Sequence, residues 1–122
     1  MMNRNHLEEY IAKTYGVIGE TPWQQYPCHK VFRHYANKKW FAVCMELPKE
    51  KIGLQGKDPI QVVNVKCEPL MIGSLLQDKG IYPGYHMNKN HWITLCLDGS
   101  VPTEKVQWLL DMSFDLTRKK MK

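Results

Sequence analysis

The sequence predicts one α+β domain in two layers, with an antiparallel sheet and helices packed on one of its faces. The chain has 122 residues, the size of a single domain, and 43% of them are hydrophobic. Its extended and helical runs follow the order helix, strand, strand, strand, helix, strand, helix. Consecutive strands joined by short connections favour antiparallel pairing, and an amphipathic helix buries its apolar stripe against such a sheet. We therefore expect residues 1–122 to form one domain without a linker or a repeat.

The first helix is predicted over residues 6–15. Its inward side chains recur at helical spacing, namely Leu7, Tyr10, Ile11 and Thr14. Asn5 is the expected N-cap, Glu8 would complete a capping box, and Gly16 suits the position after the last turn. The glycines and prolines of residues 17–28 then predict an ordered loop that Trp23 and Tyr26 fix to the body.

Two extended runs, over residues 29–35 and 39–47, predict a β-hairpin. Residues 36–39, Ala-Asn-Lys-Lys, form the expected turn. The second run is apolar on both faces, as in an interior strand. A polar loop over residues 48–58 follows, and then a third strand over residues 60–66. Within that strand we expect Val63 and Val65 to point inward and Asn64 and Lys66 to point outward.

Pro69 predicts the first turn of a second helix, because a helix leaves that N–H unpaired in any case. Gly80 is expected to stop this helix. Its expected buried side consists of Leu70, Met71, Ile72, Leu75 and Leu76. Residues 81–84 predict a turn.

A fourth strand is predicted from residue 90 or 91 to residue 97, with His91, Ile93, Leu95 and Leu97 on one face. A final helix should begin at Pro102 and run to about Lys119. Its inward stripe consists of Val106, Leu109, Leu110, Ser113, Leu116 and Thr117.

Charge and cysteine content limit the classes of function. The formal net charge is +5, and Arg118, Lys119, Lys120 and Lys122 crowd the last five residues. This excess fits either an anionic partner such as nucleic acid or a solvated basic surface. The four cysteines contain no Cys-x-x-Cys pair, so buried reduced thiols are expected rather than a metal or redox site. The absence of a signal sequence or an apolar run of about 20 residues predicts a cytoplasmic protein without a membrane partner.

Residues 82–92, Tyr-Pro-Gly-Tyr-His-Met-Asn-Lys-Asn-His-Trp, carry the richest chemistry. His86 and His91 lack the further ligands of a metal site. An imidazole with Lys89 could serve an enzyme on an anionic substrate, but no nucleophile or glycine-rich motif supports catalysis. Lys89 could instead contact phosphate while Tyr85, His86 or Trp92 stacks. Trp92 also suits a core position at the start of a strand.

These residues resemble the MmcQ/YjbR family. The characteristic stretch is Tyr82 to Thr94, followed by Leu97-Asp-Gly-Ser-Val-Pro102, and residues 63–69 resemble the segment before it. The resemblance implies a two-layer fold related to the frataxin-like CyaY fold, and DNA binding through a "double wing" arrangement. It implies no catalytic residue. Frataxin-type iron binding would need an acidic ridge, whereas the first helix offers only Glu8 and Glu9.

The leading hypothesis is a monomeric DNA-binding module without a cofactor, and an enzyme is the less favoured class. The contact candidates are His86, Asn88, Lys89, His91, Trp92, Arg33, Lys38, Lys39 and Lys66. The alternative is a binder of, or enzyme on, a small anionic ligand that uses residues 86–92 and has a concave pocket beside Trp92. A protein-interaction module, which would expose an apolar patch, is the third hypothesis.

Overall fold

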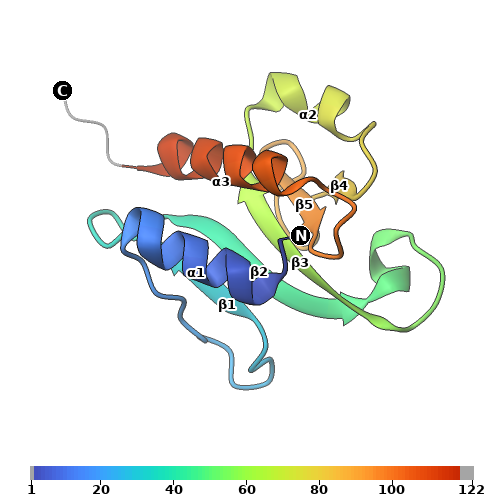
Figure 1. Cartoon of the computed structure of the whole chain (residues 1–122), viewed down its shortest axis with the longest axis horizontal. Coiled ribbons are helices and arrows are strands. Elements are labelled where there is room, and N and C mark those ends of the chain that lie inside the picture. Colours follow the sequence, from blue (N-terminus) through green and yellow to red (C-terminus); the bar gives the residue numbers. More distant parts are fainter. Residues whose placement is uncertain (1, 119–122) are drawn as a thin grey trace.

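A computed structural model describes residues 2–118 and contains a five-stranded antiparallel sheet with three α-helices (Figure 1). The elements are α1 (Arg4–Tyr15), β1 (Lys30–Arg33), β2 (Trp40–Pro48), the 3-10 helix η1 (Lys49–Ile52), β3 (Pro59–Lys66), α2 (Pro69–Leu75), β4 (Ile81–Pro83), β5 (Trp92–Cys96) and α3 (Thr103–Thr117). The strand order is β1-β2-β3-β5-β4, and every pair is antiparallel. The predicted fold class is confirmed.

Helices α1 and α3 lie side by side over one face of the sheet, which we call the helix face (Figure 1). The main core fills the space between them, with Leu7 and Ile11 of α1, Leu109 and Leu110 of α3, and buried strand residues such as Val63. We call the opposite face the loop face, because connecting segments cover it instead of helices. Its smaller core consists of Val31, Val43, Met45, Leu47, Ile60, Val62 and Cys96. The sheet is therefore apolar on both faces, as the pattern of residues 40–45 predicts.

A bulge near the start of β2 determines which of its first two aromatic side chains points to the helix face and which to the loop face. Phe32 pairs with Ala42, but the next residue, Arg33, pairs with Trp40, so Phe41 is the extra residue. Phe41 is buried in the helix-face core, whereas Trp40 meets Trp23 on the loop face. Without the bulge, strict alternation would exchange these two aromatic side chains between the faces.

Ser113 of α3 closes the sheet where the ladder between β2 and β3 ends. The last paired residues are Ala42 and Val65. Beyond them, the Ser113 hydroxyl donates to the carbonyl oxygen of Phe41 at 2.5 Å and accepts from the N–H of Lys66 at 2.8 Å. One fully buried hydroxyl thus satisfies a backbone group of each strand.

The two edges of the sheet differ in how they end. At the β1 edge, Glu20 and Val31 exchange two backbone hydrogen bonds of 2.9 and 2.8 Å, which extend the pairing by one residue. The other edge is β4, which has three residues and ends at Pro83.

Several local predictions are wrong. Asn3 rather than Asn5 caps α1, because its side-chain oxygen accepts the N–H of His6. Residues 81–83 form strand β4 instead of a turn, since Tyr82 pairs with Thr94 of β5. Helix α2 ends at Leu75, before Gly80, and Leu70 is 98% exposed rather than buried because it lies on the outer side of this short helix.

Asn64 is the most informative error. It was expected to point to solvent, and it does lie on the loop face, but it is fully buried because the segment over residues 84–91 folds across it. Val63 and Val65 point into the main core as predicted. Helix α3 ends at Thr117, and the predicted extension to Lys119 lies outside the described residues. No helix within residues 2–118 has the length and apolar character of a membrane-spanning segment.

Candidate functional site

The strand register gathers the nine candidate contact residues at one end of the sheet. Lys66, the last residue of β3, pairs with Trp92, the first residue of β5. The turn between β1 and β2 lies at the same end, because β2 begins where β3 ends. The β4–β5 connection, residues 84–91, also lies there, since Pro83 pairs with Ile93. We call this region the basic end, defined by Arg33, Lys38, Lys39, Lys66 and Lys89.

The candidates differ in accessibility. Six of them are exposed, namely Lys38, Lys39, His86, Asn88, Lys89 and His91. Arg33, Lys66 and Trp92 are half-buried. Arg33 already forms a two-pronged ion pair with Glu20, through bonds of 2.7 and 2.9 Å. The accessible positive charge therefore comes mainly from the lysines.

A buried polar pair fixes the 84–91 segment to the sheet. Thr94 donates its hydroxyl proton to Asn64 Oδ1 at 2.5 Å, and Asn64 Nδ2 donates to the carbonyl oxygen of Tyr85 at 2.9 Å. The N–H of Tyr85 donates back to Thr94 Oγ1 at 2.9 Å. Three hydrogen bonds thus hold both backbone groups of Tyr85 in place.

Two further residues shape this segment. Gly84 lies so close to Trp92 that a Cβ placed on Gly84 would come within 2.8 Å of the Trp92 backbone oxygen, so a larger residue does not fit there. Asn88 holds the turn, because its side chain accepts the N–H of Asn90 and its carbonyl accepts from His91 and Trp92. Asn88 and Trp92 are therefore structural as well as available for contact.

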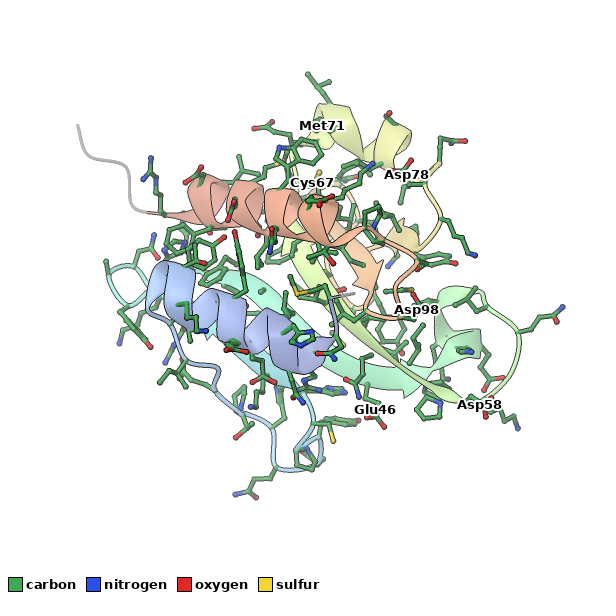
Figure 2. All side chains as sticks on the ribbon, in the orientation of Figure 1. Glu46, Asp58, Cys67, Met71, Asp78 and Asp98 are labelled. Carbon is green, nitrogen blue, oxygen red and sulfur yellow. The ribbon has the colours of Figure 1, made fainter. Side chains whose placement is uncertain are left out.

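Charge is distributed unevenly along the strands. The end opposite the basic end carries five carboxylates, Glu46, Glu50, Asp58, Asp78 and Asp98, alongside five lysines, of which Lys105 pairs with Asp78. Figure 2 shows Glu46, Asp58 and Asp98 on the side where η1 joins β2 to β3. Carboxylates at the basic end include Glu20, paired with Arg33, Glu68, and Asp115 of α3, paired with Arg118. The end of α3 belongs to this region because Asn37 of the β1–β2 turn donates to the carbonyl oxygen of Thr117. The lysines of the basic end, Lys38, Lys39, Lys66 and Lys89, have no ion-pair partner within residues 2–118, so this end carries an excess of positive charge.

The net charge of the whole chain is larger than the net charge of residues 2–118. Of the 17 Lys and Arg, the lysines at positions 119, 120 and 122 lie outside the described residues. The remaining 14 face 12 Asp and Glu, which leaves +2 for residues 2–118. An anionic partner would respond to the local distribution of charge more than to the total.

A cleft of about 460 Å³ opens on the loop face and follows β2 from Trp40, near the basic end, to Lys51 of η1, at the opposite end. Residues of β2 form its floor, and the segments over residues 23–29 and 85–87 form its walls. The lining aromatic and imidazole side chains are Trp23, Tyr26, His29, Trp40, Tyr85 and His86. Trp92 and Lys89 do not line it, so the cleft is not beside Trp92, where the small-ligand hypothesis expects a pocket.

Most of this cleft is not predicted by the sequence. From the sequence, Trp23 and Tyr26 are expected only to anchor a loop, and His29 and Trp40 have no expected role in a site. A usable signal was present, since three aromatic or imidazole residues fall within residues 23–29 and a tryptophan begins the second strand. What remained hidden was the bulge at Phe41, which turns Trp40 toward the loop face.

The four thiols should differ sharply in reactivity. Cys44, Cys67 and Cys96 are buried, and burial raises the pKa of the Cys44 thiol to about 12. Cys28 is exposed. We expect an aromatic disulfide reagent at mildly alkaline pH to label one thiol in the native protein and four in denaturant, counted by absorbance. Rapid labelling of two or more native thiols would contradict the burial of these cysteines, and Cys28→Ser is the matched control that should abolish the rapid phase.

Comparison with known proteins identifies the family. The YjbR family model matches residues 12–116, which is most of the chain. The chain belongs to the YjbR family. The resemblance drawn from residues 82–102 is thus confirmed.

Individual relatives agree with this membership. The YjbR-family chain is 36% identical to YyaQ of Bacillus subtilis over 118 residues, which covers 97% of this chain and 100% of YyaQ. It is 38% identical to YjbR of Escherichia coli K12 over 53 residues, 43% of this chain and 45% of that protein.

Solved structures extend the comparison to the fold. A crystal structure of a Pseudomonas syringae protein has 44% identity and a TM-score of 0.94, and covers 96% of this chain and 100% of its own. Protein DR2400 of Deinococcus radiodurans has 27% identity and a TM-score of 0.74, with 98% and 81% covered. The two-layer arrangement of this YjbR-family chain therefore recurs in solved relatives.

Proposed function

We propose that this protein is a cytoplasmic, monomeric module that binds nucleic acid, primarily DNA, through its basic end. The observation that carries the proposal is the polarisation of charge along the strands. Exposed Lys38, Lys39 and Lys89 give one end an excess of positive charge, whereas carboxylates and lysines balance at the other end. Such a distribution orients a polyanion toward one end of the molecule even when the net charge is small.

The shape of the basic end supports the same proposal. The β1–β2 turn and the 84–91 segment both lie at this end of the sheet, and the segment folds across β3 on the loop face. Both carry exposed lysines, Lys38 and Lys39 on the turn and Lys89 on the segment. Two loops with lysines at one end of the sheet suit contacts to DNA phosphates and the double wing that the family resemblance implies.

Aromatic groups near these lysines offer a second kind of contact. Trp40 directly follows Lys39 and is 36% exposed, and His86 is exposed near Lys89. Lysines that meet phosphate supply affinity and salt dependence, while aromatic rings can stack on unpaired bases. The proposal therefore covers duplex and single-stranded DNA, and the test compares them.

The test is the salt dependence of binding in two charge-matched variants. Lys39→Ala/Lys89→Ala removes two exposed cations from the basic end, and Lys57→Ala/Lys79→Ala removes two exposed cations from the opposite end. Lys38 is left intact because it holds a left-handed conformation, with a φ of 63°, within the β1–β2 turn. If each lost lysine contacts a phosphate of B-DNA, the slope of log affinity against log salt should fall by about 1.8 in the first variant only.

Fluorescence polarisation with labelled duplex and single-stranded DNA at several salt concentrations measures these slopes. An unchanged slope in Lys57→Ala/Lys79→Ala is the expected control result. Equal losses in both variants would show a response to net charge rather than to the basic end. No binding to either DNA at low salt would refute the proposal.

A further inference from the structure

The cleft on the loop face has the size of a small-molecule site. Its volume of about 460 Å³ lies within the range of roughly 300–1,000 Å³ that is usual for ligand pockets. Its floor is apolar and consists of Val43, Met45 and Leu47 of β2. The floor belongs to an interior strand, which pairs with β1 on one side and β3 on the other, so the sheet fixes its position.

One wall is an assembled group of rings. Trp23 packs edge-on against Trp40, with ring centroids 5.8 Å apart and planes at 84°. Tyr26 stacks on His29 at 4.9 Å with planes at 8°. The bulge at Phe41 is what brings Trp40 to this face. These contacts hold the wall in one arrangement before any ligand arrives, which lowers the entropic cost of binding.

The opposite wall of the cleft is held to the sheet by hydrogen bonds. Tyr85, His86 and Met87 reach the cleft from the segment that Asn64 and Thr94 hold to the sheet. His86 has a φ of 58°, a backbone conformation that a non-glycine residue rarely adopts. The Tyr85 and His86 rings lie 4.0 Å apart at 71°. Both walls thus present ring faces and edges above an apolar floor.

The charged groups at the cleft select between ligand types. Glu46 already accepts a hydrogen bond of 2.5 Å from Gln61 Nε2. Lys51 is exposed, and no carboxylate within residues 2–118 lies at ion-pair distance from its ammonium group. Glu46 is also exposed, and a hydrogen bond from a neutral amide leaves its carboxylate charged. An anionic group of a ligand would therefore lie toward Lys51 and away from Glu46.

We propose that the loop-face cleft binds a small compound with a planar aromatic body and one anionic group. The aromatic body lies on the floor of Val43, Met45 and Leu47, between the tryptophan wall and the Tyr85–Met87 wall. Its anionic group lies toward Lys51. This site shares Trp40 and His86 with the proposed nucleic-acid surface, but it goes beyond that surface because its cation is Lys51, and Lys39, Lys66 and Lys89 do not line the cleft.

The test uses three probe compounds that distinguish the contribution of an aromatic ring in the ligand from that of its negative charge. These are 2-naphthoate, its neutral analogue 2-naphthalenemethanol, and decanoate, which is anionic but has no ring. The protein has four tryptophans, whose indole N–H signals report the site in two-dimensional NMR titrations. Trp23 and Trp40 line the cleft, whereas Trp108 lies exposed on α3. We expect 2-naphthoate to shift the first two signals and leave that of Trp108 in place.

A matched pair of variants tests the charge. Lys51→Ala removes the ammonium group at the cleft, and Lys57→Ala removes an exposed one outside it. Because Lys51 is solvent-exposed, we expect 2-naphthoate to bind about fivefold more tightly than the alcohol. Lys51→Ala should abolish this preference while the alcohol still binds, and Lys57→Ala should preserve it.

Three results would overturn the proposal. One is the absence of Trp23 and Trp40 shifts with all three probes at millimolar concentration. Another is binding of decanoate as tightly as 2-naphthoate, which would make the site one for aliphatic chains. The third is an equal loss of preference in both lysine variants. Lys39→Ala/Lys89→Ala should bind 2-naphthoate like the unmodified protein, so failure of DNA binding and failure of this site are told apart.

Discussion

Phe41→Ala is expected to lower the free energy of unfolding by about 3–5 kcal/mol, the usual cost of removing a buried phenylalanine. Phe41 is fully buried and lies at the centre of an aromatic group on the helix face. Its ring contacts Tyr15 and Phe114 edge-on, with centroids 5.6 and 5.1 Å away. Alanine would leave a cavity between α1, α3 and the sheet, and a domain of this size has only about 5–15 kcal/mol of stability in total.

Urea unfolding followed by circular dichroism measures this loss as a lower midpoint with an unchanged slope. Trp108→Ala is the matched control, since Trp108 is an aromatic residue of α3 that is 47% exposed. It should cost about 0.5 kcal/mol or less. Similar losses in the two variants would show that Phe41 is not a central core residue.

Asn64→Ala is expected to lower the free energy of unfolding by about 2–4 kcal/mol, because it leaves two buried polar groups without their partners. These groups are the carbonyl oxygen of Tyr85 and the hydroxyl proton of Thr94. The 84–91 segment should also open more often. Hydrogen exchange at the Tyr85 amide, which donates to Thr94, should therefore accelerate by more than the global loss of stability requires.

Asn88→Ala provides the control with the same chemical change at an exposed position. The Asn88 side chain accepts one hydrogen bond, from the N–H of Asn90, at the surface. We expect a loss below about 1 kcal/mol. If Asn64→Ala proved as mild as Asn88→Ala, the buried network would not be what holds the segment to the sheet.

The larger features of the fold could be predicted from the sequence because periodicity and turn residues are local signals. The stripe of Leu7 and Ile11 and the alternation of Val63 and Val65 each identify a buried face without knowledge of the partner. Local signals fail where burial depends on a distant segment. Nothing within residues 60–66 indicates that Asn64 will be covered by a segment some twenty residues further along the chain.

In the candidate site, too, the local signals could be predicted from the sequence and the long-range contacts could not. Residues 82–92 attract attention by composition alone, but only the strand register places them at the same end as Lys38, Lys39 and Lys66. The cleft depends on one extra residue in β2, since the bulge at Phe41 sends Trp40 to the loop face. A bulge has no reliable sequence signal in an apolar run, so this part required the structure.

The edges of the sheet bear on how the molecule behaves in a crowded solution. An unpaired strand edge invites another chain to add a strand, which leads to aggregation. Here one edge strand is only three residues long and ends in a proline, which has no N–H to offer, and the other is partly occupied by Glu20. Strand addition is therefore disfavoured at both sides. The contacts proposed above, on the loop face and at the basic end, are made by side chains rather than by backbone.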